Sequence, residues 1–428
     1  MKDSPNMDQT IYISKEELEK FSNSSMMSLV GQAYKWEGEN VIHIHTIPLT
    51  HSFGEVSDVL FCKDYKELDK DWKYNFIIVV TTQDNTIDVN VYELISDTYK
   101  SVDVNYIPSK QELYSRNKGI LEINILENKR VMIVGLGSFG SQIAIELAKA
   151  GVGEFALFDF DRVELHNLAR HTATTNDLGR LKTDVIEESI KGKNPYAIVH
   201  KNPININEHL DLMEKEVAKS DLIICATDNN ESRFNLSTVL VHQKKVGIFG
   251  RAVTRAEGGD VFRYVPGGPC YCCLIGNKWY SKTSDEITSR NKAKANIGAY
   301  ISDRDADAMV QVGLSADIEP ICNMMVKLSL IELSRGSNSG IACLEEELIY
   351  DYYMWANRRE RRHKNWAAMP GAGAQPTIMR WYGAHIKRNE ECSLCSESHI
   401  ILDEGEGFVD EFGSLMNNMD MSDVKIEE

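Results

Sequence analysis

The sequence has no apolar run close to the ~18–20 residues that a membrane-spanning helix needs, and its first residues lead into no hydrophobic signal segment. Both absences predict a soluble cytoplasmic protein with no membrane partner. Basic residues are also few, since 47 Lys and Arg stand against 64 Asp and Glu for a net charge of −17. Phosphate binding favours a basic surface. Nucleic acid is therefore not an expected partner.

Cysteine is present in an odd number, nine. In a long chain without an export signal, this favours reduced thiols and metal ligands over a disulfide framework. Cys270 and Cys273 form one C-x-x-C pair, and Cys392 and Cys395 form another; the two-residue gap selects Cys273 rather than Cys272. Two such pairs supply the four soft ligands of a tetrahedral structural zinc. Unpaired buried thiols are the alternative.

With 428 residues the chain is long enough for two or three folded units. Residues 1–110 alternate strand-like runs with polar turns, which predicts a small N-terminal accessory α+β domain. Its first 26 residues are polar and are expected to be frayed. Residues 111–395 form the main domain, which contains a polar crossover loop at 277–312. Residues 396–428 form an acidic tail that we expect to be disordered, with docking as the alternative role.

From Lys129 onward, short apolar strands alternate with helical segments. This alternation predicts an α/β domain with a doubly wound, Rossmann-like, mostly parallel sheet. The expected strands are Arg130–Val134, Glu154–Phe160, Ala197–Asn202 and Asp221–Ala226, and the expected helices are Gln142–Ala150, Thr183–Lys191 and Ile318–Leu333.

A glycine-rich loop follows the first of these strands and opens a helix. Gly135, Gly137 and Gly140 have the spacing that lets backbone N–H groups approach a phosphate at the helix N-terminus. Asp159 follows at the tip of the next strand, where a carboxylate can hold ribose hydroxyls. These features suit NAD as well as ATP, so an NAD-dependent oxidoreductase is one interpretation.

The residues that follow favour nucleotidyl transfer. Asp161, Asn167, Arg170 and Lys182 gather charged and amide side chains for which a nicotinamide pocket has little use. When a carboxylate attacks the α-phosphorus of ATP, negative charge builds on the phosphate oxygens, and fixed cations and amide donors stabilise it. Asp228, at the end of a later strand, offers a carboxylate suited to Mg²⁺.

These motifs and the two cysteine pairs resemble the ThiF/MoeB-type adenylyltransferases, which include the thiamine- and molybdopterin-pathway activating enzymes and the ubiquitin-activating enzymes. The resemblance runs from about Glu112 to Cys395. It implies an adenylation domain that uses ATP to activate the C-terminal carboxylate of a small ubiquitin-like or sulfur-carrier protein, giving acyl-AMP and pyrophosphate. It also implies a homodimer and a structural role for the zinc.

Individual roles follow from the same resemblance. The glycine loop and Asp159 would hold adenosine and ribose, with Asp161 in the same site. Asn167, Arg170 and Lys182 would contact the triphosphate, and Asp228 would organise Mg²⁺. In homodimeric members an arginine just before the first strand enters the partner's active site, and Arg116 is the matching residue here.

Three features depart from the family pattern. His171 stands where the family has glutamine. Residues 274–319 contain no cysteine, although members that pass their cargo onward carry a nucleophilic cysteine there. The protein would then stop at the adenylate, use Cys272 or Cys322, or form an oxyester on a loop hydroxyl; we favour the first. Finally, the N-terminal domain and acidic tail exceed what a minimal cofactor-pathway enzyme requires.

The extra segments suggest a bacterial ubiquitin-like conjugation pathway with a conjugating enzyme as a further partner. Sulfur-carrier activation in thiamine- or molybdopterin-type cofactor biosynthesis is the alternative, and a catalytically silent scaffold is another. Gly258-Gly259 and Gly267-Gly268 could admit a thin C-terminal tail. His43 and His45, two residues apart, are interpreted as alternate strand residues on an exposed face.

Overall fold

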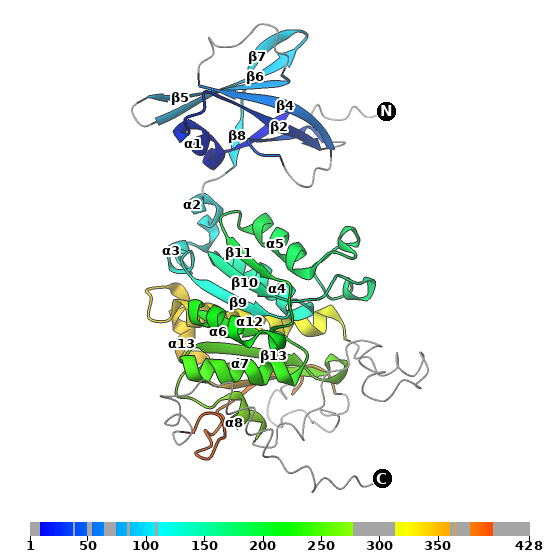
Figure 1. Cartoon of the computed structure of the whole chain (residues 1–428), viewed down its shortest axis with the longest axis vertical. Helices are drawn as coiled ribbons and strands as arrows, with labels where there is room; N and C mark the ends of the chain where they lie inside the picture. Colours follow the sequence, from blue (N-terminus) through cyan, green and yellow to red (C-terminus); the bar gives the residue numbers. More distant parts are fainter. Residues whose placement is uncertain are drawn as a thin grey trace, which may run out of the picture. The chain divides into compact units, whose positions relative to one another are not determined.

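The chain divides into two compact units, Met1–Arg116 and Asn117–Glu428, in a computed structural model (Figure 1). The structure describes residues 9–36, 39–48, 54–63, 74–83, 86–107, 110–276, 313–359, 364 and 377–396. The predicted crossover loop at 277–312 and the acidic tail from residue 397 onward lie outside these residues. Each unit has its own sheet and its own apolar core.

In the first unit, the described strands form one eight-stranded sheet in the order β7-β6-β5-β4-β2-β3-β1-β8. Most neighbours are antiparallel, while β1 is parallel to both β3 and β8 and β4 is parallel to β5. This arrangement is of the predicted α+β kind. The elements are β1 (Thr10–Ser14), α1 (Lys15–Asn23), β2 (Ser28–Trp36), β3 (Val41–His45), β4 (Gly54–Cys62), β5 (Phe76–Gln83), β6 (Thr86–Ile95), β7 (Thr98–Val102), β8 (Asn105–Ile107) and α2 (Lys110–Leu113).

The prediction of a frayed N-terminal segment is wrong for residues 9–26. β1 is an inner strand of the sheet and buries Ile11 and Ile13. The Ser14 side chain then accepts a hydrogen bond from the Glu17 N–H and caps α1, which buries Leu18 and Phe21 against the same core. The apolar residues are few, but they alternate at the strand period and then follow the helix period.

The face of β3 that carries the two strand histidines is partly covered, and not exposed as predicted. His43 and His45 lie on the face of β3 opposite Ile42 and Ile44, as alternation requires. However, the His45 side chain is only 15% exposed, and its Nδ1 lies 2.9 Å from a carboxylate oxygen of Glu17. This contact ties β3 to α1, so it serves the fold of the first unit.

In the second unit, the described strands form a second eight-stranded sheet in the order β11-β10-β9-β12-β13-β14-β15-β16. The pairs from β11 to β13 are parallel, and the pairs from β13 to β16 are antiparallel. The order of the parallel strands confirms the predicted Rossmann-like fold. The strands are β9 (Arg130–Val134), β10 (Glu154–Phe158), β11 (Ile198–Asn202), β12 (Leu222–Cys225), β13 (Val246–Ala252), β14 (Gly258–Tyr264), β15 (Tyr352–Ala356) and β16 (Arg380–Ala384).

Helices pack on both faces of this sheet. Along β9, Val131 and Ile133 face the core formed with α4, α5 and α12, whereas Met132 and Val134 face the core formed with α6 and α7. In Figure 1, α6 and α7 lie across one face of the sheet. The helices are α3 (Ile123–Leu126), α4 (Ser138–Ala150), α5 (Lys182–Lys193), α6 (Leu210–Lys219), α7 (Asn230–Gln243), α8 (Tyr271–Ile275), α12 (Ser315–Ser334) and α13 (Leu344–Glu347).

One of the two glycine pairs predicted to admit a peptide tail is buried within the fold. Gly258 and Gly259 begin β14, all of whose residues are buried. A Cβ at Gly259 would lie 2.1 Å from Cδ1 of Ile321, so this glycine lets α12 approach the sheet. The interpretation of this pair as an opening for a tail is wrong.

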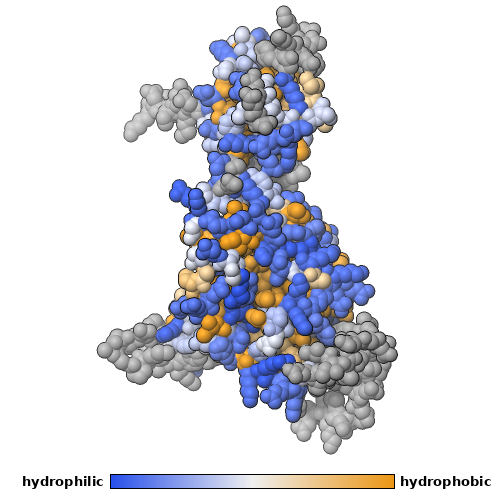
Figure 2. Space-filling model, turned by 90° about the vertical axis from the view of Figure 1, so that its left-hand side faces the viewer, coloured by the Kyte–Doolittle hydropathy of each residue, from blue (hydrophilic) through white to orange (hydrophobic). Residues whose placement is uncertain are grey.

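Hydrophilic side chains cover most of the face shown in Figure 2, and hydrophobic ones form scattered patches. Within the described ranges, none of the helices combines the length and the apolar character that a bilayer crossing requires.

Candidate functional site

The predicted site residues of the second unit lie at the carboxyl edge of its parallel strands. The strand order reverses at β9, whose neighbours are β10 and β12, and ligands of doubly wound sheets bind at such a position. The loop after β9 is held from both sides. The Gly135 N–H donates to the Phe158 carbonyl at 2.8 Å, and the Ala226 N–H donates to the Val134 carbonyl at 2.8 Å.

The glycines of the loop have different structural roles. Gly135 has a φ of +86°, and a Cβ there would lie 2.8 Å from the Ala226 carbonyl oxygen. A Cβ at Gly140 would lie 1.9 Å from the Gly135 carbonyl oxygen. A Cβ at Gly137 would meet no neighbouring atom within 4 Å, and this residue caps α4 without a side-chain hydrogen bond. The amino end of α4 therefore presents backbone N–H groups that can donate to an anion.

This difference gives a testable pair of substitutions. Gly140→Ala is expected to destabilise the fold by about 2–4 kcal/mol, because the loop backbone must move to relieve the clash. Gly137→Ala is expected to leave the melting temperature within about 2 °C, because its Cβ meets no protein atom, yet to weaken ATP binding about tenfold or more by occupying the space a phosphate needs. Thermal unfolding and calorimetric titration with ATP–Mg²⁺ measure the two effects. Unchanged ATP affinity in Gly137→Ala would place the phosphates elsewhere.

Asp159, Asp161 and Lys182 form a charged cluster beside the loop, in which Asp159 and Lys182 are buried and the Asp161 side chain is exposed. Asp159 accepts hydrogen bonds from the N–H groups of Leu136 at 2.6 Å and Asp161 at 2.8 Å. Lys182 Nζ lies 2.7 Å from Oδ2 of Asp161 and 3.9 Å from Oδ1 of Asp159. Asp159 thus fixes the glycine loop, while Lys182 joins the start of α5 to the end of β10.

Asp228 belongs to the same cluster. Burial lowers the pKa of Lys182, but the negative charges of Asp159, Asp161 and Asp228 outweigh it and raise that pKa above its ordinary value. Lys182 is therefore a cation, and the carboxylates of Asp159, Asp161 and Asp228, which follow β10 and β12, all act on its charge. Carboxylates in excess of cations are a suitable environment for a divalent metal ion with oxygen ligands.

Asn167 and Arg170 lie on a short turn that faces the glycine loop. The Asn167 backbone carbonyl accepts from the N–H groups of Arg170 and His171, at 2.9 and 2.8 Å. The Asn167 side chain accepts from the Glu164 N–H at 2.9 Å. Together with Gly137 and Ser138, these residues line a hollow of about 40 Å³, which is smaller than a nucleotide.

Arg170 has the properties of an anion-binding residue. It is half-buried, and burial lowers the pKa of its guanidinium. Among the described residues, no carboxylate lies within ion-pair distance of it. A desolvated cation without a counter-charge is costly for the protein alone, and it gains stabilisation when an anion binds.

A groove of about 590 Å³ adjoins the hollow and shares Arg170 and His171 with it. Cys322, one of the thiols considered as a nucleophile, lines this groove. It is 3% exposed, and burial raises the pKa of its thiol. Since the thiolate is the nucleophilic form, Cys322 is poorly suited to the role. The loop hydroxyls considered for an oxyester lie outside the described residues.

Arg116 does not belong to the second unit, which holds the other candidate site residues. It is exposed, within the short turn Ser115–Asn117, and is the last residue of the first unit. Its role in a partner's site stays a prediction. His171, noted from the sequence only as a departure, proves to be 8% exposed and hydrogen-bonded to the glycine loop. Its position directly after Arg170 is the signal by which it could have been found.

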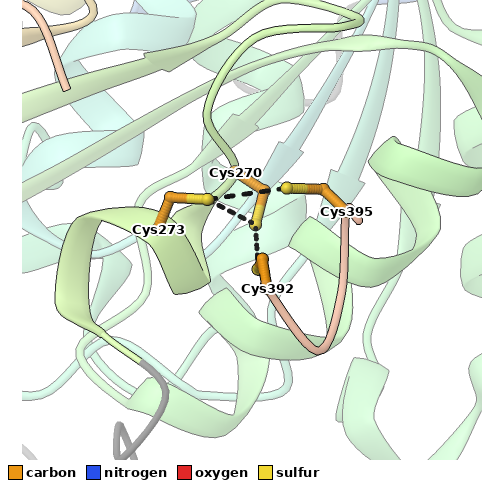
Figure 3. Close-up of side chains that lie close together, drawn as sticks. All are labelled: Cys270, Cys273, Cys392 and Cys395. Carbon is orange, nitrogen blue, oxygen red and sulfur yellow. Dashed lines mark hydrogen bonds between the residues drawn. The ribbon is translucent and has the colours of Figure 1, made fainter. Parts of the chain in front are cut away.

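The four predicted metal-ligand cysteines converge, although they come from distant parts of the sequence (Figure 3). Their Sγ atoms all lie within 4.8 Å of one another. The separations are 3.8 Å for Cys270–Cys273, 3.6 Å for Cys270–Cys392 and 3.5 Å for Cys273–Cys395. Metal–sulfur bonds of about 2.3 Å in a tetrahedron place sulfurs about 3.8 Å apart, so this geometry fits a tetrahedral metal ion. As predicted, Cys273 rather than Cys272 completes the set.

Backbone groups support the same cysteines. The Asn389 N–H donates to Sγ of Cys273 at 3.4 Å, and the Leu394 N–H donates to Sγ of Cys392 at 3.5 Å. Such N–H···S bonds favour the thiolate form that binds metal. Cys270, Cys392 and Cys395 are buried in the core shared with α6 and α7. The cluster therefore attaches the segment after β16 to the rest of the second unit.

Known proteins with similar sequences support an adenylyltransferase fold. The molybdopterin-synthase adenylyltransferase of Escherichia coli K12 is 36% identical over 151 residues, which are 35% of this chain and 59% of that protein. The adenylyltransferase and sulfurtransferase MOCS3 of Aedes aegypti is 32% identical over 170 residues, which are 38% of each chain. The chain thus spans 59% or less of the length of these relatives.

A solved structure, E. coli MccB with ATP, is similar with a TM-score of 0.44 and 18% identity, over 64% of this chain and 68% of that chain. The ThiF family model matches residues 114–343, which include the glycine loop, the charged cluster, the Arg170 turn and the first cysteine pair. This match covers more than half of the 428 residues, and the chain therefore belongs to the ThiF family.

Proposed function

We propose that the protein is an adenylyltransferase that activates the C-terminal carboxylate of a small ubiquitin-like or sulfur-carrier protein. The observation that carries this proposal is the position of Arg170. A half-buried guanidinium without a carboxylate partner among the described residues faces an uncapped helix N-terminus across the hollow. The guanidinium and the helix N-terminus both favour an anion in this hollow, and the phosphates of a nucleoside triphosphate are such an anion.

The residues of the site have distinct roles in this reaction. The backbone N–H groups of the glycine loop bind phosphate oxygens, and Asp159 at the strand end holds the ribose. Arg170 and Lys182 supply positive charge to the triphosphate, and Asn167, which lines the hollow, contacts it. A carboxylate oxygen of the carrier attacks the α-phosphorus, the bond to the β-phosphate oxygen breaks, and pyrophosphate leaves with the negative charge. Fixed cations and amide donors stabilise that charge as it develops.

Two metal ions belong to the proposal. Asp228, with Asp161 near Lys182, would hold Mg²⁺, which neutralises phosphate charge when bound. Cys270, Cys273, Cys392 and Cys395 would hold zinc, because thiolate sulfurs at tetrahedral separations match that ion. Four protein ligands leave no open coordination position, so the zinc would be structural.

The remaining parts of the proposal concern partners. We infer a cytoplasmic homodimer in which Arg116 enters the partner's site, and an N-terminal accessory domain that recruits a further protein. Two pathways fit the site equally well. One is sulfur-carrier activation in cofactor biosynthesis, in line with the names of the relatives. The other is a bacterial ubiquitin-like conjugation pathway with a conjugating enzyme.

ATP–pyrophosphate exchange tests the proposed function. The full chain is mixed with ATP, Mg²⁺ and labelled pyrophosphate, together with a series of small carrier proteins that end in glycine. Exchange is expected with at least one carrier and is expected to disappear when its terminal glycine is deleted, because that deletion displaces the reacting carboxylate. The same carrier with an amidated C-terminus is the matched control.

Thermal unfolding separates this function from the alternatives. ATP with Mg²⁺ is expected to raise the melting temperature, since a ligand that binds only the folded state stabilises it. Protection by NAD but not by ATP would instead indicate an oxidoreductase. ATP binding without exchange for any carrier would leave a catalytically silent scaffold.

A further inference from the structure

His171 joins the two sides of the candidate nucleotide site. Its Nε2 lies 2.8 Å from the carbonyl oxygen of Leu136, in the glycine loop. Its Nδ1 lies 2.9 Å from the backbone nitrogen of Ala173. The imidazole is buried and lines both the small hollow and the adjoining groove. The His171 side chain thus contacts both the glycine loop and the backbone of Ala173, three residues after Arg170.

The hydrogen bonds fix the tautomer of the ring. The Ala173 backbone nitrogen can only donate, so Nδ1 of His171 must accept and carries no proton. The Leu136 carbonyl can only accept, so Nε2 must carry the proton and donate. The neutral Nε2–H tautomer satisfies both contacts, whereas a protonated ring would place a donor opposite the Ala173 N–H.

The contact continues to α5. Ala173 packs in a small apolar cluster with Val163 and with Val185 of α5, the helix that begins at Lys182. His171 therefore connects the glycine loop, the Arg170 turn and the helix that carries Lys182. A buried side chain with both ring nitrogens bonded restricts these three parts to one arrangement.

We propose that His171 is a positioning residue that sets the distance between the glycine loop and Arg170 through its Nε2–H bond to the Leu136 carbonyl. This proposal rests on the proposed ATP-dependent function. His171 acts through the loop and the turn, so it serves nucleotide binding without transferring a proton. A glutamine side chain can replace it, because an amide also offers one donor and one acceptor.

The charge state of the ring supports this role. Burial lowers the pKa of His171 to about 4; the hydrogen bond to the Leu136 carbonyl raises it, the positive charge of Lys182 lowers it, and Asp177 raises it. The ring is therefore neutral throughout the physiological range. The unfolded chain binds a proton near pH 6.5 and the folded one near pH 4, so the stability from His171 is present above pH 6.5 and is lost as pH falls towards 4.

The test compares His171→Leu and His171→Gln with the wild-type chain in ATP–pyrophosphate exchange. His171→Leu is expected to raise the KM for ATP by about 10- to 100-fold, with a smaller change in kcat, because Arg170 and the loop lose their fixed spacing. His171→Gln is expected to restore the KM to within about threefold of wild type by retaining the bond to Leu136. His200→Leu, on the exposed surface of β11, is the matched control and should behave as wild type.

The pH dependence gives a second readout, which decides the question even where His171→Leu fails to fold. The ratio of the KM values of His171→Gln and wild type is expected to stay constant between about pH 8 and pH 5.5. The melting temperature of wild type should fall more steeply than that of His171→Gln below about pH 6.5. A KM ratio that changes near pH 6.5, or equal KM values for His171→Leu and wild type, would overturn the role. A wild-type chain without any exchange would instead refute the function itself.

Discussion

Arg170→Ala is expected to lower the rate of ATP–pyrophosphate exchange by about 100- to 1,000-fold, the usual effect of removing one preorganised group that stabilises developing charge. The melting temperature should stay within about 2 °C of wild type, because Arg170 has no carboxylate partner among the described residues whose loss would expose a buried charge. Exchange kinetics and calorimetry on the same preparation measure both quantities.

The matched control is Arg335→Ala at the end of α12. Arg335 is partly exposed and pairs with Glu332 and Glu345. Its removal makes the same change in net charge, and the buried Glu332 keeps its ion pair with Arg263. This variant should exchange pyrophosphate as wild type does. If Arg170→Ala keeps full exchange activity, or if it unfolds, the guanidinium serves the fold and the proposed site is wrong.

Cys392→Ala is expected to lower the metal content from about one zinc per chain to near zero and to destabilise the second unit by at least about 3 kcal/mol. For a unit of this size, that corresponds to a fall of roughly 6–12 °C in melting temperature. The reason is that Cys392 lies against Cys270 in the core, and without a metal the two cysteine pairs lose the bonds that would join them. Metal analysis and thermal unfolding measure the effect, and chelation of wild type should reproduce it.

Two other cysteines act as controls. Cys272 lies beside the cluster but outside the set of four, and Cys343 is exposed at a distance in sequence from all of them. Cys272→Ala and Cys343→Ser should each retain about one zinc per chain, since all four ligands remain. Loss of the metal in Cys272→Ala would mean that the ligand set is different. Full stability after complete removal of the metal would show that the cluster does not hold the fold together.

Three of the parallel strands, β9, β10 and β12, were predictable because they are buried on both faces. Such strands are continuous apolar runs, and β9 agrees with the prediction residue for residue. The predicted ends of strands and helices were less accurate. β10 stops at Phe158 rather than Phe160, because the Asp159 carboxylate turns towards the Leu136 N–H. α4 begins at Ser138 rather than Gln142, because Gly140 hid the first turn from a helical pattern.

The residues of the candidate site could be grouped from the sequence, but their contacts could not be predicted. Spacing around strand ends identified Asp159, Lys182 and Asp228 together, and the structure brings their charges close. The sequence could not show that Lys182 pairs with Asp161, or that His171 bonds to Leu136, because these contacts depend on how two loops meet in space. The buried glycines of β14 were misjudged for the same reason, since the helix packed on them is distant in sequence.

The order in which translation delivers the cysteines has a consequence for biogenesis. The ribosome completes β9 to β13 and the first C-x-x-C pair well before it reaches Cys392, near the end of the described residues. A nascent chain therefore carries Cys270 and Cys273 with only half of the ligand set while α12, β15 and β16 are being synthesised. All four sulfurs can meet only after the second pair emerges, so the complete set assembles late in synthesis.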